Sequence, residues 1–313
     1  MSFAKLALCA AIAASSVAAR AEDARMKPFV LASRGPGELE QAVEGAKAKL
    51  AAAGFTVAGS YSPYAGTVVL AVTSDELAAA AAQARFGSYA AAQRVTVTKV
   101  GAETQVAYTN PVYMAAAYRM KADLSPLAAK LAKALGAMEE FGPPEGKRAK
   151  DLKGFHYMIG MPYFDDAWKL ATFPSQAEAL AAVAAGLAAG RGGTKQVYRI
   201  SVSPDETVFG VGLSDGCGGD ANVMKEIDVK PLRSSAHLPY ELIVSKGEVF
   251  ALHAKFRIAV NFPDLSMMGD HSFMRIRCAP DSIEKALKAV AAAPAKAAVV
   301  PAAATVPAGP SGS

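Results

Sequence analysis

Two stretches of the chain carry the information that decides its fold: residues 60–75 read SYSPYAGTVVLAVTSD, and residues 201–215 read SVSPDETVFGVGLSD. In both, a Ser-x-Ser-Pro turn leads into an apolar segment that begins with Thr-Val and ends with Ser-Asp. The offset between them is 141 residues at the turn and 140 in the apolar segment. Several matches in nearly one register indicate an internal duplication.

The segments around both stretches follow one order of strands and helices. In the first copy we predict strands at 27–33, 55–61, 67–72, 94–99 and 104–109, with helices over 37–53 and from Ser74. In the second copy we predict a strand within 157–173, a helix from Ser175 to about Ala189, strands at 196–202 and 207–213, and a hairpin of 241–245 with 249–256.

Short hairpin connections force antiparallel pairing of these strands. We therefore expect an α+β protein of two related lobes, each a mainly antiparallel sheet with helices on one face, in the order β-α-β-β-α-β-β. The second copy continues with a predicted short strand at 273–278. A capping-box pattern, Asp281 with Glu284, then opens a helix whose Ile283, Leu287 and Val290 share one face.

The two ends of the chain differ in composition from the rest. Lys5 followed by the uncharged run 6–17 and the triplet Ala19-Arg20-Ala21 predicts a cleaved signal peptide over 1–21, with a periplasmic or secreted mature protein. The remaining bounds are a first repeat with a trailing helix at 22–137, a linker at 138–153, a second repeat at 154–293, and a disordered Ala/Pro-rich tail at 294–313.

Charge and hydropathy limit the classes of partner. Cleavage after residue 21 removes two basic residues and no acidic one, so the formal net charge falls from +5 to +3. The basic residues that cluster within 147–153 are interleaved with acids, which favours a solvated linker over a nucleic-acid groove. No later apolar run reaches the length of a membrane span, so we expect no membrane span after signal cleavage.

The first half resembles a bacterial family described as domain of unknown function 302. The resemblance rests on Gly54-Phe55, the hairpin around Gly101, and 106–111, VAYTNP, leading into a helix with Met114; it covers about 26–120. It extends more loosely to the second copy, where Phe262-Pro263-Asp264 replaces the Asn-Pro pair. The resemblance implies a compact α/β fold that tends to self-associate, hence a possible homo-oligomer, and it brings no catalytic residues.

Two cysteines remain after signal cleavage, Cys217 in a glycine-rich loop and Cys278 at the end of the predicted strand 273–278. In an oxidising compartment two such thiols favour a disulfide. The alternative is a buried Cys278 and an exposed free thiol at Cys217.

Soft metal ligands occur in two clusters. His156, Met158 and Met161 lie close together in sequence, as do Met267, Met268 and His271, and thioether with imidazole suits copper. The competing interpretation is that these methionines fill a core. Copper is accordingly an alternative, and no cofactor is expected otherwise.

A literal G-x-S-x-G places Ser214 between Gly212 and Gly216, with Asp264 and His271 following in the chain order of a hydrolase triad. The strand before Ser214 belongs to a predicted antiparallel hairpin, which is not the context of a nucleophile elbow. A serine hydrolase is thus a weak alternative. The function we expect is an exported soluble binding or interaction protein, with an unknown small molecule or protein as its ligand and no catalysis of its own.

Overall fold

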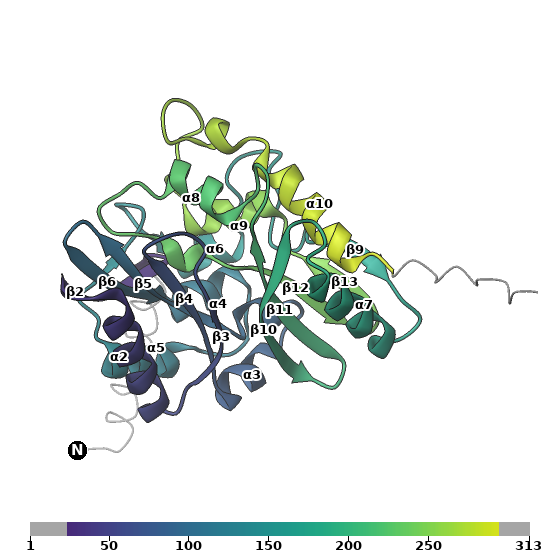
Figure 1. Cartoon of the computed structure of the whole chain (residues 1–313), viewed down its shortest axis with the longest axis horizontal. Coiled ribbons are helices and arrows are strands. Elements are labelled where there is room, and N and C mark those ends of the chain that lie inside the picture. Colours follow the sequence, from purple (N-terminus) through teal and green to yellow (C-terminus); the bar gives the residue numbers. More distant parts are fainter. Residues whose placement is uncertain (1–23, 294–313) are drawn as a thin grey trace, which may run out of the picture.

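The computed structural model describes residues 24–293 and contains two larger antiparallel sheets (Figure 1). The predicted signal peptide and the predicted tail lie outside the described residues. The first sheet has the strand order β3-β4-β5-β6-β2-β7 and the second has the order β10-β11-β12-β13-β9. The strands of the first sheet are β2 (Phe29–Pro36), β3 (Thr56–Tyr61), β4 (Thr67–Thr73), β5 (Gln93–Val100), β6 (Glu103–Thr109) and β7 (Glu139–Phe141).

The second sheet repeats the strand order of the first. Its strands are β9 (Trp168–Thr172), β10 (Thr194–Ser203), β11 (Glu206–Leu213), β12 (Tyr240–Ser245) and β13 (Glu248–Ala251). In each sheet four consecutive strands run in chain order, and the strand before the first helix pairs with the fourth of them. All pairings are antiparallel, as the short hairpins require.

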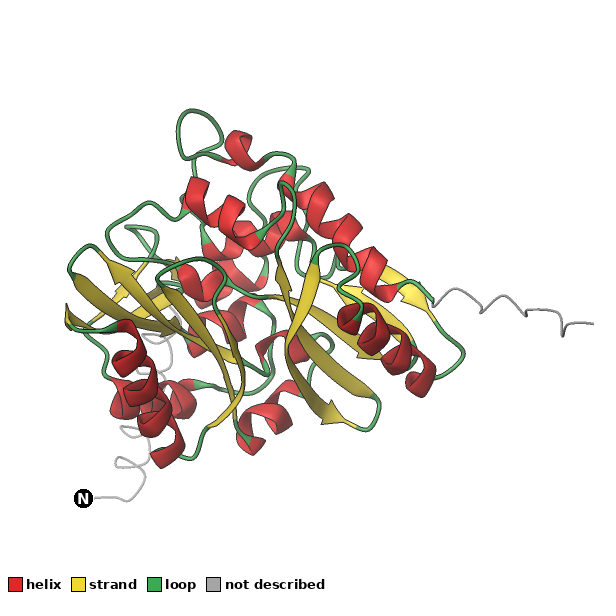
Figure 2. Cartoon of the chain, in the orientation of Figure 1, coloured by secondary structure: helices red, strands yellow, loops and turns green. Residues whose placement is uncertain are grey.

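Helices cover the outer face of each sheet, so the predicted α+β class is confirmed (Figure 2). α2 (Leu39–Ala52) and α5 (Ser125–Leu135) pack on the first sheet, while α7 (Gln176–Ala188) and α10 (Ala279–Ala291) pack on the second. The remaining helices are α3 (Asp75–Ala81), α4 (Pro111–Ala117), α6 (Ala149–Lys153), α8 (Asp220–Ile227), α9 (Ala254–Asn261) and the short 3-10 helices η1 (Gly87–Ala90), η2 (Ser235–His237) and η3 (Phe273–Ile276). Among residues 24–293, no helix is both long enough and apolar enough to cross a bilayer.

Side-chain caps fix several helix starts at the predicted residues. Ser74 Oγ accepts a hydrogen bond from the Leu77 amide at 3.2 Å. Ser175 is the predicted N-cap, with the Glu178 amide donating to Ser175 Oγ at 3.2 Å, and the Ser175 hydroxyl lies 3.2 Å from Glu178 Oε1, so the contact is part of the predicted capping box. Such caps satisfy amide groups that have no partner inside the helix.

Two predicted strands are wrong in the second half. The hairpin strand predicted at 249–256 ends at Ala251, and α9 begins at Ala254, with His253 Nδ1 accepting from the Lys255 amide at 3.2 Å. The strand predicted at 273–278 is the 3-10 helix η3 followed directly by α10. A short apolar run fits strand and helix equally well, so its pattern could not decide between them.

The start of α10 also differs from prediction. The helix begins at Ala279 with Pro280 in its first turn, so Asp281 and Glu284 do not form a capping box. Proline favours the first helical turn because its missing N–H is not needed there. The predicted face is confirmed, since Ile283, Leu287 and Val290 are all fully buried.

The segment predicted as a linker, 138–153, is built into the structure. β7 extends the first sheet by pairing with β2, and β8 (Lys147–Arg148) pairs with β1 (Arg25–Met26). Phe141 explains the docking of β7, because its ring is buried 5.5 Å from that of Phe29.

The two sheets meet where β3 lies beside β10 (Figure 1), and η1 and η2 complete this junction. β3 runs beside β10 so closely that a Cβ on Gly59 would overlap the Val197 carbonyl. A 3-10 helix from each half also packs on the sheet of the other half: η1 contacts β11 and β12, and η2 contacts β4, β5 and β6. One continuous core therefore joins residues of both halves.

Candidate functional site

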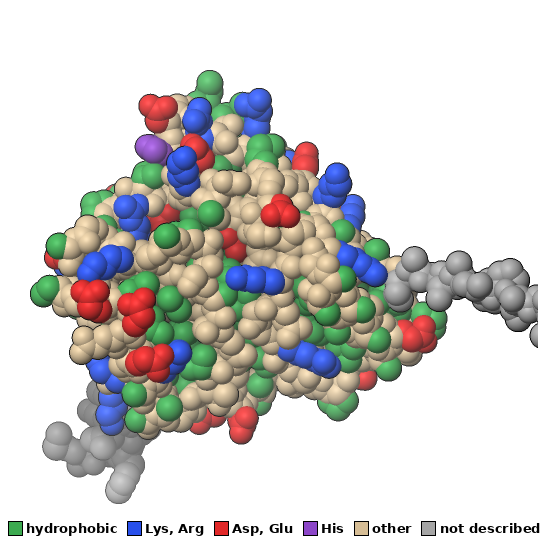
Figure 3. All heavy atoms as spheres, viewed as in Figure 1, with side chains coloured by type: hydrophobic (Ala, Val, Ile, Leu, Met, Phe, Trp, Pro, Cys, Tyr) green, Lys and Arg blue, Asp and Glu red, His purple; other side chains and the backbone are tan. Residues whose placement is uncertain are grey.

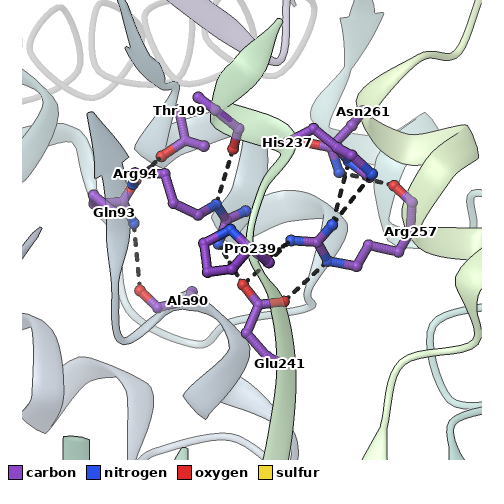
Figure 4. A network of polar contacts seen from close by, with 10 residues as sticks. Ala90, Gln93, Arg94, Thr109, His237, Pro239, Glu241, Arg257 and Asn261 are labelled. Carbon is purple, nitrogen blue, oxygen red and sulfur yellow. Dashed lines mark hydrogen bonds and ion pairs between the residues drawn. The ribbon is translucent and has the colours of Figure 1, made fainter. Parts of the chain in front are cut away.

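A buried ion cluster of Arg94, Glu241 and Arg257 lies at the centre of the junction (Figure 4). Arg94 on β5 donates from Nη1 to Glu241 Oε1, and Arg257 on α9 donates from Nε to Glu241 Oε2, both at 2.9 Å. All three side chains are 1% exposed. Arg94 belongs to the first half and the other two belong to the second, so the cluster ties the halves together.

His237 lies beside the cluster and stays neutral. Burial, followed by the repulsion of Arg257 and Arg94, holds the pKa of His237 well below its ordinary value. Its ring nitrogens lie 3.3 and 3.4 Å from Arg257 Nη1, and a neutral ring nitrogen can accept there. The Arg94 Nε donates to the carbonyl of the neighbouring Ala236 at 3.0 Å.

Several buried polar atoms around the cluster have no hydrogen-bond partner among the described residues. They are Arg94 Nη2, Asp220 Oδ1, Asn261 Oδ1 and the hydroxyls of Tyr89, Tyr118 and Tyr198. A buried polar atom without a partner costs about 1 to 3 kcal/mol. The centre of the junction therefore combines strong ion pairs with unsatisfied groups.

A second polar contact crosses the junction from β3 to α8. The Tyr61 hydroxyl donates to Asp220 Oδ2 at 2.9 Å, and the Leu213 amide donates to the same oxygen at 3.1 Å. Burial raises the pKa of Asp220 to about 7, although both hydrogen bonds lower it in part. Burial also raises the pKa of Tyr61, and Asp220 adds to that increase.

A cavity of about 510 Å³ opens on the junction next to α8. We call it the junction cavity, and its lining comes from both halves: Tyr64, Ala65, Thr67, Thr98, Lys99, Ala221, Met224, Lys225, Asp228, Val229 and Arg233. The volume lies within the range of small-molecule sites, roughly 300 to 1,000 Å³. Because neither half closes it alone, the cavity exists only when the halves are packed together.

Hydroxyl groups form the inner wall of the junction cavity. The Tyr64 hydroxyl lies 2.8 Å from Ser235 Oγ, and Thr98 Oγ1 donates to that same oxygen at 3.3 Å. Thr67 is 1% exposed, and its Oγ1 lies near the Tyr64 hydroxyl without a hydrogen bond of normal geometry. Ser235 precedes Ala236, so η2 links this wall to the buried ion cluster.

The charged residues of the junction cavity are three bases and one acid. Lys99 and Arg233 are half-buried and Lys225 is exposed, while Asp228 is buried. Burial raises the pKa of Asp228 to about 6, opposed by the Ser234 amide and by Arg233. On the face shown in Figure 3, Lys/Arg and Asp/Glu side chains are interspersed.

The residues of the two predicted metal clusters are only partly brought together. Met161 and Met267 line one small apolar pocket with Tyr157, Phe262 and Phe273. Met158 and Met268 are 45% and 77% exposed. His156 packs against Tyr163, and His271 Nδ1 lies 3.0 Å from the Glu226 carbonyl. Within residues 24–293, no group of three or more His, Cys, Asp or Glu side chains is arranged to hold a metal.

The members of the weak hydrolase candidate have separate partners. Ser214 Oγ donates to the Gly193 carbonyl at 2.8 Å and lies 3.0 Å from Asp215 Oδ1. Asp264 pairs with Lys230, and His271 contacts Glu226. Ser214 thus has neither predicted partner as a hydrogen-bonding neighbour.

Cys217 and Cys278 lie at disulfide distance, with their Cα atoms 6.0 Å apart. The pair joins the loop before α8 to the N-terminal end of α10. It therefore anchors the helix that supplies one wall of the junction cavity.

Sequence reasoning missed the junction cavity and the buried ion cluster. Arg94 and Glu241 occupy predicted strands, where alternation alone places a side chain on one face or the other. The signal that could have found them is a charged residue at an inward position of an otherwise apolar strand, such as Glu241 in 240–245, YELIVS. Buried charges are rarely found without partners.

Comparison with known proteins gives no match: no family model, no curated protein and no solved structure corresponds to this chain. The resemblance to domain of unknown function 302 accordingly stays a prediction. The functional argument rests on the geometry of the junction.

Proposed function

We propose that the protein is an exported binding protein that holds a small molecule in the junction cavity. The observation that carries this proposal is a cavity lined from both halves, with a wall of hydroxyl groups that includes the unpartnered Thr67 Oγ1. Ligand sites occur preferentially between structural units and combine apolar walls with a few polar groups. The junction cavity has both features.

Export to the periplasm or the medium is part of the same proposal. It is supported by the sequence of residues 1–21 and by a cysteine pair at disulfide distance. N-terminal sequencing of protein from an exporting host should find Glu22 first, and thiol titration of the denatured, unreduced protein should find no free thiol. Retention of Met1 in a cytosolic pool would refute export, and two free thiols would refute the bridge.

We also propose that the two halves arose by duplication of one unit. Their common strand order and the reciprocal placement of η1 and η2 support this. The resemblance to domain of unknown function 302 implies units that self-associate. In this chain, the junction would then be the same kind of contact, made between two units of one polypeptide. Separate expression of residues 22–153, which keeps β7 and β8 with the first sheet, and of residues 154–293 tests the association: we expect the two fragments to bind each other when mixed.

Filling the cavity tests the binding function directly. Ala221 is an exposed lining residue on α8, and Ala221→Trp should occupy the cavity without breaking a hydrogen bond. Native mass spectrometry of freshly purified protein should show a small-molecule adduct on the wild type that Ala221→Trp lacks. Ala48→Trp, on the exposed face of α2, is the control and should keep the adduct. An adduct retained by Ala221→Trp would place the ligand elsewhere.

Copper handling is the second candidate, because Met161 and Met267 line the same pocket. Thioether ligands favour Cu(I). Titration of the apo protein with Cu(I) should then show binding that Met161→Leu and Met267→Leu weaken, whereas Met138→Leu, at an exposed site in the first half, should have no effect. Equal Cu(I) affinity in all variants would remove this candidate.

A further inference from the structure

The junction cavity carries more positive than negative charge, because three bases, Lys99, Lys225 and Arg233, line it together with one acid, Asp228. Lys99 Nζ donates to the Gly37 carbonyl at 2.7 Å, and Arg233 Nη1 donates to the Asp228 main-chain carbonyl. Among the described residues, the charged ends of Lys99, Lys225 and Arg233 form no ion pair and no hydrogen bond to another side chain, whereas the Arg233 main-chain amide donates to Gln105 Oε1 at 3.2 Å. Nearby bases differ, since Lys230 pairs with Asp264 and Arg275 pairs with Glu226.

The single acid of the cavity is held by its own turn. Asp228 Oδ1 accepts from the Ser234 amide at 2.7 Å, and Oδ2 accepts from Ser235 Oγ at 3.4 Å. These bonds direct the carboxylate toward the segment that leads into η2. Asp228 therefore leaves the side chains of Lys99 and Lys225 available to a ligand.

The groups opposite these bases are suited to the rest of a small ligand. Tyr64, Thr67 and Thr98 offer hydroxyls, and Ala65, Ala221, Met224 and Val229 offer a short apolar surface. A guanidinium binds carboxylate and phosphate oxygens in a planar fork, and ammonium groups add attraction without a fixed geometry. The lining thus complements a short polar skeleton that ends in an acidic group.

Another junction cavity provides the contrast. A cavity of about 530 Å³ beside α3 is also lined from both halves, but its lining contains two bases, Arg85 and Lys246, together with three acids, Asp205, Glu206 and Glu248. Acids outnumber bases in this lining, so the cavity does not favour anions. An excess of bases is a property of the cavity beside α8.

We infer that the ligand of the junction cavity is a small organic acid whose carboxylate or phosphate is bound by Arg233, Lys225 and Lys99. This inference rests on the proposed binding function and names its ligand class. The hydroxyl wall then contacts the uncharged part of the acid, with Thr67 as an available hydrogen-bonding group.

Isothermal titration calorimetry with paired acidic and neutral probes tests the inference. The acids are succinate, citrate, glycerol 3-phosphate and glucose 6-phosphate, and the neutral probes are succinamide, glycerol and glucose. We expect binding of at least one acid and of no neutral probe, with affinity that falls between 50 and 300 mM salt. Comparison of the two carboxylates with the two phosphates shows which acidic group the cavity binds.

Charge-removing variants identify the residues. Lys225→Gln should bind the acid about fivefold more weakly, the effect of losing about 1 kcal/mol from one exposed charge. Lys225 is exposed, so this variant should fold, and an unchanged melting temperature will confirm that. Lys49→Gln, an exposed lysine at the end of α2, is the control and should bind as the wild type does.

The outcomes separate the ligand class from the function. If a neutral probe binds, is excluded by Ala221→Trp and is unaffected by Lys225→Gln, the acid class is wrong and the binding function stands. If an acid binds equally well to Lys225→Gln, Arg233→Gln and Lys99→Gln, the assignment to this cavity is wrong. If no probe binds and no adduct accompanies the purified protein, both proposals fail.

Discussion

At the residue scale, Asp220 links protonation to stability. Its pKa is raised to about 7 in the folded protein, whereas an aspartate in the unfolded chain has its ordinary pKa of 3.8. Between these values the folded state binds more protons, so stability falls as pH rises from about 4 to 7 and is then constant for this group. The shift corresponds to roughly 4 kcal/mol at most.

Asp220→Asn should therefore reduce the pH dependence of stability. The amide oxygen can still accept from Tyr61 or the Leu213 amide, and asparagine carries no charge to desolvate. Urea unfolding at pH 5 and pH 8 should show that the variant loses less stability on going to pH 8 than the wild type does. The variant should keep part of the pH dependence of stability, because the pKa of Asp228 is also raised, to about 6. An identical loss in both proteins would mean that Asp220 is not protonated at pH 5.

The unpartnered hydroxyl of Tyr198 gives a second prediction at this scale. Tyr198→Phe removes a buried group without a hydrogen bond, so we expect a free energy of unfolding equal to the wild type or up to about 1 kcal/mol higher. Tyr113→Phe is the matched variant, since its hydroxyl donates to the Val260 carbonyl at 2.8 Å. That variant should lose about 1 kcal/mol. Equal losses in thermal and urea unfolding would show that Tyr198 has a partner, such as water.

At the element scale, the sequence predicted most strands, their antiparallel pairing and helices on one face of each sheet, because these depend on local periodicity and hairpin length. It did not predict the order of the strands in the sheets, such as the pairing of β2 with β6. It failed at α8, which follows the glycine-rich segment 216–219 and starts from Asp220 without a side-chain cap. It also failed at α9 and η3, where a short apolar run is compatible with the periodicity of a strand and with that of a helix. The caps at Ser74 and Ser175 could be predicted because the cap residue and its helix are neighbours in sequence.

The internal repeat predicted from the sequence illustrates how the register of an alignment can mislead. An offset of 140 pairs Leu70 with Gly210, yet Leu70 lies in the core under α2 and α5. Gly210 instead lies opposite Glu241 in the β11–β12 pair, and the Glu241 side chain contacts Arg94 across the junction. Gly210 is therefore on the junction face and not on the helix-covered face. Side chains alternate between the two faces of a strand, so an alignment that matches helix-covered positions of β4 with helix-covered positions of β11 needs an odd offset. The offset of 141 in the turn region meets this condition.

The close approach of β3 and β10 gives a prediction for these elements. Gly59→Ala should destabilise the protein by more than about 2 kcal/mol, because its Cβ would overlap the Val197 carbonyl and separate the two edges. Gly45→Ala, in α2 with open space around it, is the control and should gain up to about 1 kcal/mol. Urea unfolding measures both. A tolerated Gly59→Ala would show that the sheet edges are not in contact.

At the scale of the whole molecule, the site depends on contacts that no single segment encodes. Lys99 and Lys225 belong to different halves, and each alone looks like an ordinary surface lysine. Their convergence follows from the contact of η2 with the first sheet and from the position of α8, which lines the same cavity as β4 and β5. The sequence could predict the units but not the geometry with which they dock.

The buried ion cluster should decide whether the two halves unfold as one. Glu241→Gln keeps the shape of the side chain but leaves Arg94 and Arg257 buried at 1% exposure without an anionic partner. Removing one partner of a buried pair costs about 3 to 5 kcal/mol. Because Arg94 belongs to the first half and Arg257 to the second, we expect a large loss of stability together with weaker coupling between the halves.

Urea unfolding followed by fluorescence and circular dichroism measures both effects of Glu241→Gln. The single tryptophan, Trp168, reports on the second sheet, whereas circular dichroism reports on both. In the wild type the two signals should change together, and in Glu241→Gln the transitions should move to lower urea and separate. Glu44→Gln is the control, because Glu44 pairs with Lys47 on the exposed surface of α2 and its loss should cost less than about 0.5 kcal/mol. If Glu241→Gln costs no more than Glu44→Gln, the cluster does not hold the junction, and the packing of η1 and η2 alone joins the two sheets.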